Sequence, residues 1–145
     1  MPTPPLTIYD FDQVNAIFGT VLLDGFAEGT AISIERTEDT FTMKTGCDGL
    51  TSRSKTLNRT AKVTFTLMQT SAANLKLSLI HALDRDTPNG AGVLPLLVRD
   101  NGGSSIHTAT QAWISKAPDV KYEREASERT WEISVARLEG VEGGN

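Results

Sequence analysis

Two segments of the chain alternate between apolar and polar side chains, residues 62–67 and residues 130–135. An alternation with a period of two places one set of side chains on the buried face of a β-strand and the other set on solvent. We therefore predict two half-buried strands whose apolar members share one core. These members are Val63, Phe65, Leu67, Trp131, Ile133 and Val135.

The apolar spacing changes directly after the first of these strands. Leu75, Leu79 and Leu83 recur at helical spacing, a Thr-Ser pair before them can cap a helix, and a Thr-Pro-Asn sequence follows them. We predict an α-helix over about residues 71–84. Leu75 and Leu79 are expected to pack on the sheet, in the same core as the strand residues.

Shorter segments predict further strands. One strand fits residues 16–23 and another fits residues 106–115. Residues 32–35 and 41–43 alternate on either side of a polar turn, which favours a hairpin between them. Residues 93–98 are apolar but contain a proline, which has no N–H to donate and is typical of an edge or bulged strand.

These elements predict a mainly β protein, a two-sheet antiparallel β-sandwich or barrel with one flanking α-helix. A chain of 145 residues fits a single domain, residues 1–145, and can bury roughly 70% of its unfolded surface. Three segments lack a strand or helix pattern: a Pro-rich, flexible N-terminal arm at 1–7, a long polar loop between strands at 46–60, and a flexible, Gly-containing tail at 139–145. We expect the arm and the tail to become ordered only against neighbouring subunits.

The charged side chains are unevenly distributed, although the net charge is only −4. Residues 1–45 carry seven acidic and two basic side chains, whereas the 46–60 loop carries Arg53, Lys55 and Arg59 against one acidic residue. Such a loop is either solvated or meets an acidic surface of an identical neighbour in a head-to-tail contact. An acidic protein is poorly suited to gripping a nucleic acid backbone.

Residues that could carry chemistry are scattered. His81 and His107 are the only histidines and do not form a metal-binding motif; Cys47, the single cysteine, is expected to be a small, semi-buried residue without a base beside it. No nucleophile, base and orienting residue can be assembled, so we predict no catalysis, no metal site and no cofactor. No apolar run approaches a membrane span, and the N-terminus lacks a signal-peptide pattern, which favours a cytoplasmic site of synthesis and no membrane insertion.

Five segments of the chain, taken in order, resemble a known family. They are YDFDQVNAIFG, TGCDG, TLMQTSAAN, TATQAWISKAPDV and WEISVARLEG. Together they are similar to the tail-tube proteins of contractile-tailed bacteriophages, whose fold is shared with type VI secretion and pyocin tubes. The resemblance implies a structural subunit without catalytic residues. It also implies that six copies form a ring and that rings stack into a hollow tube conducting DNA during ejection.

The resemblance further implies where the protein works and what it meets. We expect it in the virion tail, assembled in the host cytoplasm, with contacts to other copies of itself, the tail sheath, the baseplate hub and the tape-measure protein. DNA is expected to pass without specific binding. A lumen that does not hold DNA should be lined by hydroxyl and acidic groups, and the outward strand positions supply candidates. These are Glu35, Thr40, Thr42, Thr64, Thr66, Glu132 and Ser134.

Two sets of residues are candidates for contacts between subunits. Arg53, Lys55 and Arg59 are expected to join successive rings. Tyr9, Phe11 and Val14 are expected either to lie across an adjacent subunit or to cover the core edge of their own subunit. Lys44 and Lys62 do not suit a lumen unless carboxylates pair with them.

Two alternatives stay open at the level of sequence. A pyocin or type VI tube component would have the same fold. A ligand-binding β-sandwich module belongs to another class, but such modules usually expose clustered aromatic residues, whereas Trp113 and Trp131 lie in apolar strand patterns that favour the core.

Overall fold

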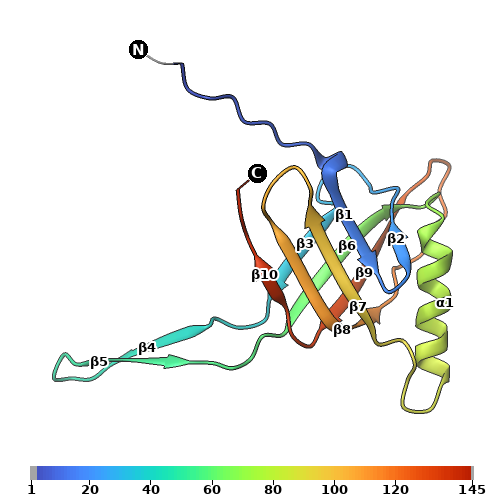
Figure 1. Ribbon diagram of the computed structural model, residues 1–145. Helices are drawn as coiled ribbons and strands as arrows, with labels where there is room; N and C mark the ends of the chain where they lie inside the picture. The colour runs from blue at the N-terminus through green and yellow to red at the C-terminus, as the bar shows by residue number, and fades with distance from the viewer. Residues whose placement is uncertain (1–2, 145) are drawn as a thin grey trace.

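The computed structural model describes residues 3–144, which form antiparallel β-sheets and one α-helix (Figure 1). The predicted mainly β fold with two antiparallel sheets and a flanking helix is confirmed. The elements, in chain order, are the 3-10 helix η1 (Phe11–Gln13), β1 (Val14–Phe18), β2 (Val21–Leu23), β3 (Ile32–Arg36), β4 (Phe41–Thr45), β5 (Thr51–Lys55), β6 (Ala61–Met68), α1 (Ala73–Asp86), β7 (Leu94–Asp100), β8 (Ile106–Lys116), β9 (Glu128–Val135) and β10 (Glu139–Val141).

The larger sheet has eight strands in the order β2-β1-β7-β8-β9-β6-β3, with β10 beside β8. The chain after β2 returns to β6, where Met68 N–H donates to the Gly25 carbonyl over 2.7 Å and Ala27 N–H donates to the Thr66 carbonyl over 3.0 Å. These bonds join the segment that follows β2 to β6, which lies near the other end of the strand order, so the sheet curls around its core. Figure 1 shows α1 alongside this curled sheet and the smaller β4–β5 sheet extending away from it.

The core contains the alternate residues of the strands, as the sequence predicts. Trp131, Ile133 and Val135 are buried in β9, and Phe65 and Leu67 are buried opposite them in β6. Cross-strand pairing is in register, with Phe65 facing Trp131 and Val63 facing Ile133. The inward assignment of these two strands is confirmed.

The helix presents a different face to the core from the one predicted. Leu77 is fully buried and Ala73 nearly so, whereas Leu75 and Leu79 are 67% and 62% exposed. The helix begins at Ala73, and residues at 73, 77 and 80 make its inward stripe. The prediction that Leu75 and Leu79 belong to the core is therefore wrong, because the helix carries a second apolar stripe at the same spacing.

A polar bridge fixes the helix against β9. The indole Nε1 of Trp131 donates to Asn74 Oδ1 over 3.0 Å, and Asn74 Nδ2 donates to the Met68 carbonyl over 2.9 Å and to the Gln69 carbonyl over 3.3 Å. The same asparagine thus joins the last strand of the core, the first turn of the helix and the end of β6. Trp113, by contrast, is only partly buried and pairs with Ser134 on the outward face of β8, so its expected place in the core is wrong.

Two strand predictions need correction, and one of two predicted alternatives is confirmed for a third strand. The 16–23 segment is a hairpin of β1 and β2 rather than one strand, because Gly19 turns the chain with φ +63°. β3 pairs with β6 instead of β4. β7, predicted to be an edge or a bulged strand, lies inside the sheet between β1 and β8, and the bulge is confirmed, because the register shifts between Leu94 and Leu96, on either side of Pro95.

Candidate assembly surfaces

The β4–β5 hairpin extends into solvent from the β3–β6 end of the curled sheet (Figure 1). All ten residues of its two strands are exposed. The predicted 46–60 loop therefore contains a strand, β5, whose partner is β4. Thr51–Lys55 has no apolar alternation because neither face of this hairpin meets the core of its own subunit.

The turn of the hairpin is defined locally. Gly46 N–H donates to the Leu50 carbonyl over 2.9 Å, and Leu50 N–H donates to Asp48 Oδ1 over 3.2 Å. Gly49 has φ +85°, a conformation that favours glycine. Cys47 lies in this turn and is exposed, which corrects the expectation of a semi-buried thiol.

The two faces of the hairpin differ in chemistry. Phe41 pairs with Lys55 and Met43 pairs with Arg53, so these four side chains share one face. The Arg53 guanidinium lies 4.3 Å from the centre of the Phe41 ring. We call this the basic-apolar face. The opposite face carries Thr42 and Lys44 of β4 with Ser54 and Ser52 of β5.

The three predicted inter-ring residues do not form one cluster. Arg53 and Lys55 lie on the hairpin, whereas Arg59 follows it and pairs with Glu139 of the same chain over 3.6 Å. The backbone carbonyl of Arg59 also accepts the Leu138 N–H over 2.9 Å. Arg59 thus helps to hold the root of the hairpin. The role of Arg53 and Lys55 between rings stays a prediction.

Five of the seven candidate lumen residues share one surface, the face of β3, β6 and β9 that points away from the core. Thr64 pairs with Glu132, and Thr66 pairs with Thr130, whose hydroxyl lies 3.4 Å away. Lys62 is a basic residue on this face of hydroxyl and acidic groups, and it forms an ion pair with Glu132 over 2.9 Å. The expectation that a carboxylate pairs with Lys62 is therefore confirmed. The five residues are Glu35, Thr64, Thr66, Glu132 and Ser134. Thr40 and Thr42 belong to the hairpin instead.

The second apolar stripe of α1 is an exposed surface. It contains Leu75, Leu79 and Leu83, of which Leu83 is 57% exposed. Contiguous exposed apolar side chains of this kind are typical of contact sites. The sequence pattern contains this stripe but cannot show which of the two apolar faces of the helix meets the sheet.

The N-terminal arm is extended up to η1, and residues 3–10 are exposed. The ring of Phe11 packs edge-on against Phe26 with centroids 5.5 Å apart, and Val14 pairs with Asp100 in the sheet. Phe11 and Val14 therefore contact their own subunit, although Phe11 is still 37% exposed, and Tyr9 is 60% exposed. Residues 1–2 of the predicted 1–7 arm lie outside the described residues.

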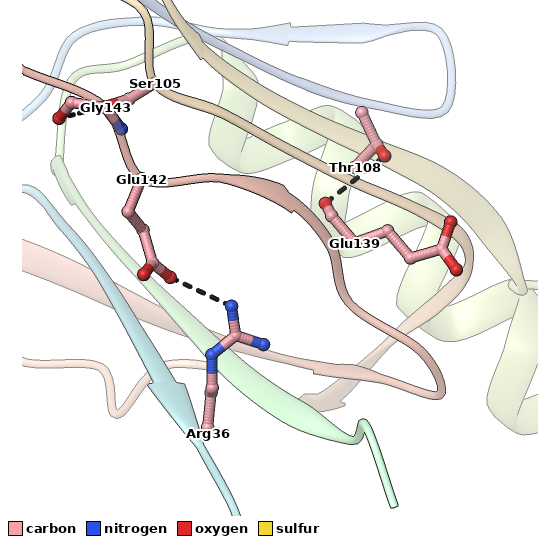
Figure 2. Close-up of polar contacts among 6 residues, drawn as sticks. All are labelled: Arg36, Ser105, Thr108, Glu139, Glu142 and Gly143. Carbon is pink, nitrogen blue, oxygen red and sulfur yellow. Dashed lines mark hydrogen bonds and ion pairs between the residues drawn. The ribbon is translucent and has the colours of Figure 1, made fainter. Parts of the chain in front are cut away.

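The C-terminal segment is tied to the sheet, which corrects the prediction of a tail that is ordered only by neighbours. β10 pairs with β8, and Figure 2 shows Glu142 reaching Arg36 of β3, with 2.9 Å between Oε1 and Nη2. Ser105 exchanges two hydrogen bonds with the backbone of Gly143, of 3.0 and 3.1 Å (Figure 2). Asn145, the end of the predicted tail, lies outside the described residues.

The close approach of the C-terminal segment to β8 explains the glycine at position 140. A Cβ on Gly140 would overlap the carbonyl oxygen of Ile106, and Gly140 has φ +147°. Beneath the segment lies His107, whose pKa is lowered by burial, raised by Glu142 and lowered by Arg36, with a net lowering. The neutral imidazole is therefore the favoured form under the C-terminal segment.

A groove opens at the other end of β6 and β9 from the root of the hairpin. It has a volume of about 660 Å³ and lies between β9 and the loop that joins β8 to β9. Lys116 and Lys121 contribute to its lining, but carboxylates outnumber them. The carboxylates are Asp119, Glu123, Glu125, Glu128 and Glu132. We call this the acidic groove; sequence reasoning missed it because its members are spread over a loop and a strand.

Residues 3–144 show little sign of functions other than contact with other molecules. No group of three or more His, Cys, Asp and Glu side chains in this range could hold a metal ion. None of the helical residues described forms a span long and apolar enough to cross a membrane.

Comparison with known proteins defines the class. The fold matches a chain of the sheath–tube complex of PVC, an extracellular contractile injection system, with a TM-score of 0.60 and 9% identity over 94% of this chain and 91% of that one. It also matches a chain of the anti-feeding prophage tube-terminating cap, with a TM-score of 0.59 and 7% identity over 97% and 95%. These similarities establish a fold that this chain shares with components of contractile injection systems.

The particular family follows from sequence. The chain belongs to the bacteriophage PhiTE tail tube protein family, whose model matches residues 7–143. It is 34% identical over 123 residues to structural protein ORF10 of Pseudomonas phage KPP10, covering 85% of this chain and 71% of that protein. The resemblance found in the sequence is confirmed: the protein is a structural component of a phage tail.

Proposed function

We propose that this protein is the repeating subunit of a hollow tail tube, in which six copies form a ring and rings stack into a conduit for DNA during ejection. The observation that carries the proposal is the β4–β5 hairpin. A two-stranded hairpin is at best marginally stable by itself in water, and every residue of both strands is exposed here. Contacts with the next ring would stabilise it.

Ring formation is supported by the edges of the curled sheet. In the strand order of residues 3–144, β2 and β3 are the terminal strands, each with one strand partner. Terminal strands offer unpaired N–H and C=O groups to another chain. Pairing between subunits would satisfy these groups and extend the sheet around a ring.

The lumen would be lined by the polar face of β3, β6 and β9. This face carries hydroxyl and carboxylate groups, and its Lys62 is already paired with Glu132. A surface without free cations has little attraction for phosphates. DNA would therefore pass without specific binding.

Further partners are proposed from the tail context. The exposed leucine stripe of α1 offers an apolar surface suited to another tail protein, and the sheath, the baseplate hub and the tape-measure protein are the candidates. Assembly would take place in the host cytoplasm. A second candidate function, a tube component of a pyocin, type VI or related contractile injection apparatus, is supported by the shared fold alone.

Electron microscopy and analytical ultracentrifugation test the proposal. Purified protein should form rings at moderate concentration and tubes of uniform bore at high concentration. Reversing two charges with Arg53→Glu and Lys55→Glu should leave rings intact and shorten or abolish tubes. A matched control, Lys76→Glu with Arg99→Glu, reverses two charges outside the hairpin and should stack normally. A protein that stays monomeric at every concentration, even with baseplate or tape-measure protein added, would refute the tube.

A further inference from the structure

The hairpin and the acidic groove lie at opposite ends of the same pair of strands. The hairpin connects to β6 through residues 56–60, next to Ala61, which pairs with Val135. The groove is lined by Glu128, which pairs with Met68 at the far end of β6. Seven residue steps along a strand span about 23 Å. A contact between hairpin and groove therefore joins one end of a subunit to the opposite end of another.

The two surfaces are complementary in charge. The basic-apolar face presents Arg53 and Lys55. Five carboxylates line the groove against two lysines. One of these carboxylates, Glu132, is already neutralised by Lys62, which leaves four against two. Complementary potentials of this kind fix the register of a contact and suppress wrong partners.

The hairpin also exposes apolar side chains: Met43 is 76% exposed and Phe41 is 45% exposed. Val120 and Tyr122, on the loop beside the groove, are 54% and 81% exposed but do not line it. Apolar surface thus lies beside the charges of the hairpin and next to the groove, and protein contacts commonly combine an apolar centre with a polar rim.

We propose that the acidic groove is the receiving site for the basic-apolar face of the β4–β5 hairpin of a second copy of this chain. The inference rests on the proposed function, because it names the surface that the hairpin meets when rings stack. The contact is heterologous: each subunit uses its hairpin on one side and its groove on the other. When successive copies are related by a translation along an axis, as in a stack, a heterologous contact can repeat indefinitely instead of closing into a ring.

Charge exchange between the two surfaces gives a direct test. Reversing the groove with Glu123→Lys and Glu125→Lys should raise the protein concentration needed for stacking by roughly tenfold or more, as Arg53→Glu with Lys55→Glu should. Combining all four substitutions should restore stacking toward the wild-type concentration. The matched control, Asp12→Lys with Glu28→Lys, makes the same change of net charge outside both surfaces and should leave stacking unchanged.

A crosslink gives an independent readout. In a Cys47→Ser background, one copy carries Met43→Cys and a second copy carries Ala126→Cys, at the lining of the groove. Mild oxidation of the mixture should yield a disulfide-linked heterodimer, and neither variant alone should yield a comparable homodimer. Circular dichroism confirms that every variant is folded.

The outcomes separate this inference from the proposed function. The inference fails, while the proposed tube stands, if groove-reversed protein stacks like wild type. It also fails if the variant with all four substitutions does not regain stacking and the crosslink is absent, because the hairpin then binds elsewhere. If groove-reversed protein stacks normally but no longer binds purified sheath protein, the groove belongs to the sheath and the inference is likewise overturned. If wild-type protein forms no rings or tubes, the proposed function and the inference fail together.

Discussion

Two leucines two positions apart on α1, and therefore on different faces of the helix, provide a sharp test of how the helix packs. Leu77 is fully buried, and Leu79 is 62% exposed. Truncation of a buried leucine to alanine removes transfer free energy and leaves a cavity, at a typical cost of about 2 to 5 kcal/mol. Truncation of an exposed leucine changes stability by about 0.5 kcal/mol or less, and alanine has the higher helix propensity.

The measurable difference is large for a domain of this size. With an unfolding entropy of about 2.1 cal/mol/K per residue, a loss of about 3 kcal/mol lowers Tm by on the order of 10 °C. Leu77→Ala should therefore melt about 10 °C below wild type, and Leu79→Ala should melt within about 2 °C of it. Urea unfolding followed by far-UV circular dichroism gives the same comparison as free energies, with similar slopes expected for both variants.

The stabilities of the two variants can also be compared at several protein concentrations. The Leu77→Ala loss should be the same at all concentrations, because this side chain lies in the subunit's own core. A loss in Leu79→Ala that grows with concentration would indicate that assembly buries the leucine stripe. Equal losses for the two variants in dilute protein would refute the orientation of α1 described above.

Three further predictions concern the core and the C-terminal segment. Trp131→Phe should cost about 1 to 3 kcal/mol in urea unfolding, because it leaves the partly buried Asn74 Oδ1 without its indole donor. Gly140→Ala should lower Tm by several degrees and expose the C-terminus to carboxypeptidase, since it adds a Cβ against β8 at positive φ; the control Gly144→Ala has open space around it and should behave as wild type. Burial lowers the pKa of His107 below 6.5, so the unfolded state takes up its proton first; stability should fall as pH drops below about 6.5 and level off below the folded pKa, and His107→Gln should flatten this dependence in pH-resolved urea titrations.

The sequence predicts well those elements whose pattern has one physical cause. β6 and β9 alternate because one face of each strand meets the core, and the structure buries their predicted residues. The existence of the helix follows equally from its period. Its orientation does not, because Leu77 and Leu79 belong to two apolar stripes and only tertiary packing selects between them.

The hairpin is the element that sequence reasoning could not recover. β5 consists of Thr, Ser, Arg and Lys and reads as a polar loop, since neither of its faces meets the core of its own subunit. The pairing of β3 was missed for a related reason: the polar turn after it resembles a hairpin turn, whereas Thr37 is held by hydrogen bonds to the Thr60 carbonyl and directs the chain out of the sheet. Patterns within one chain report burial within that chain, and elements that stay exposed leave a weaker trace.

The placement of hairpin and groove at opposite ends of the subunit gives any stack built through this contact a direction. One terminus of such a tube displays only unfilled acidic grooves, and the other displays only unoccupied basic hairpins. Growth at the two termini is therefore chemically distinct, and tube length is not encoded in the subunit. A protein that initiates the tube and a protein that ends it must present opposite charges, so neither can substitute for the other.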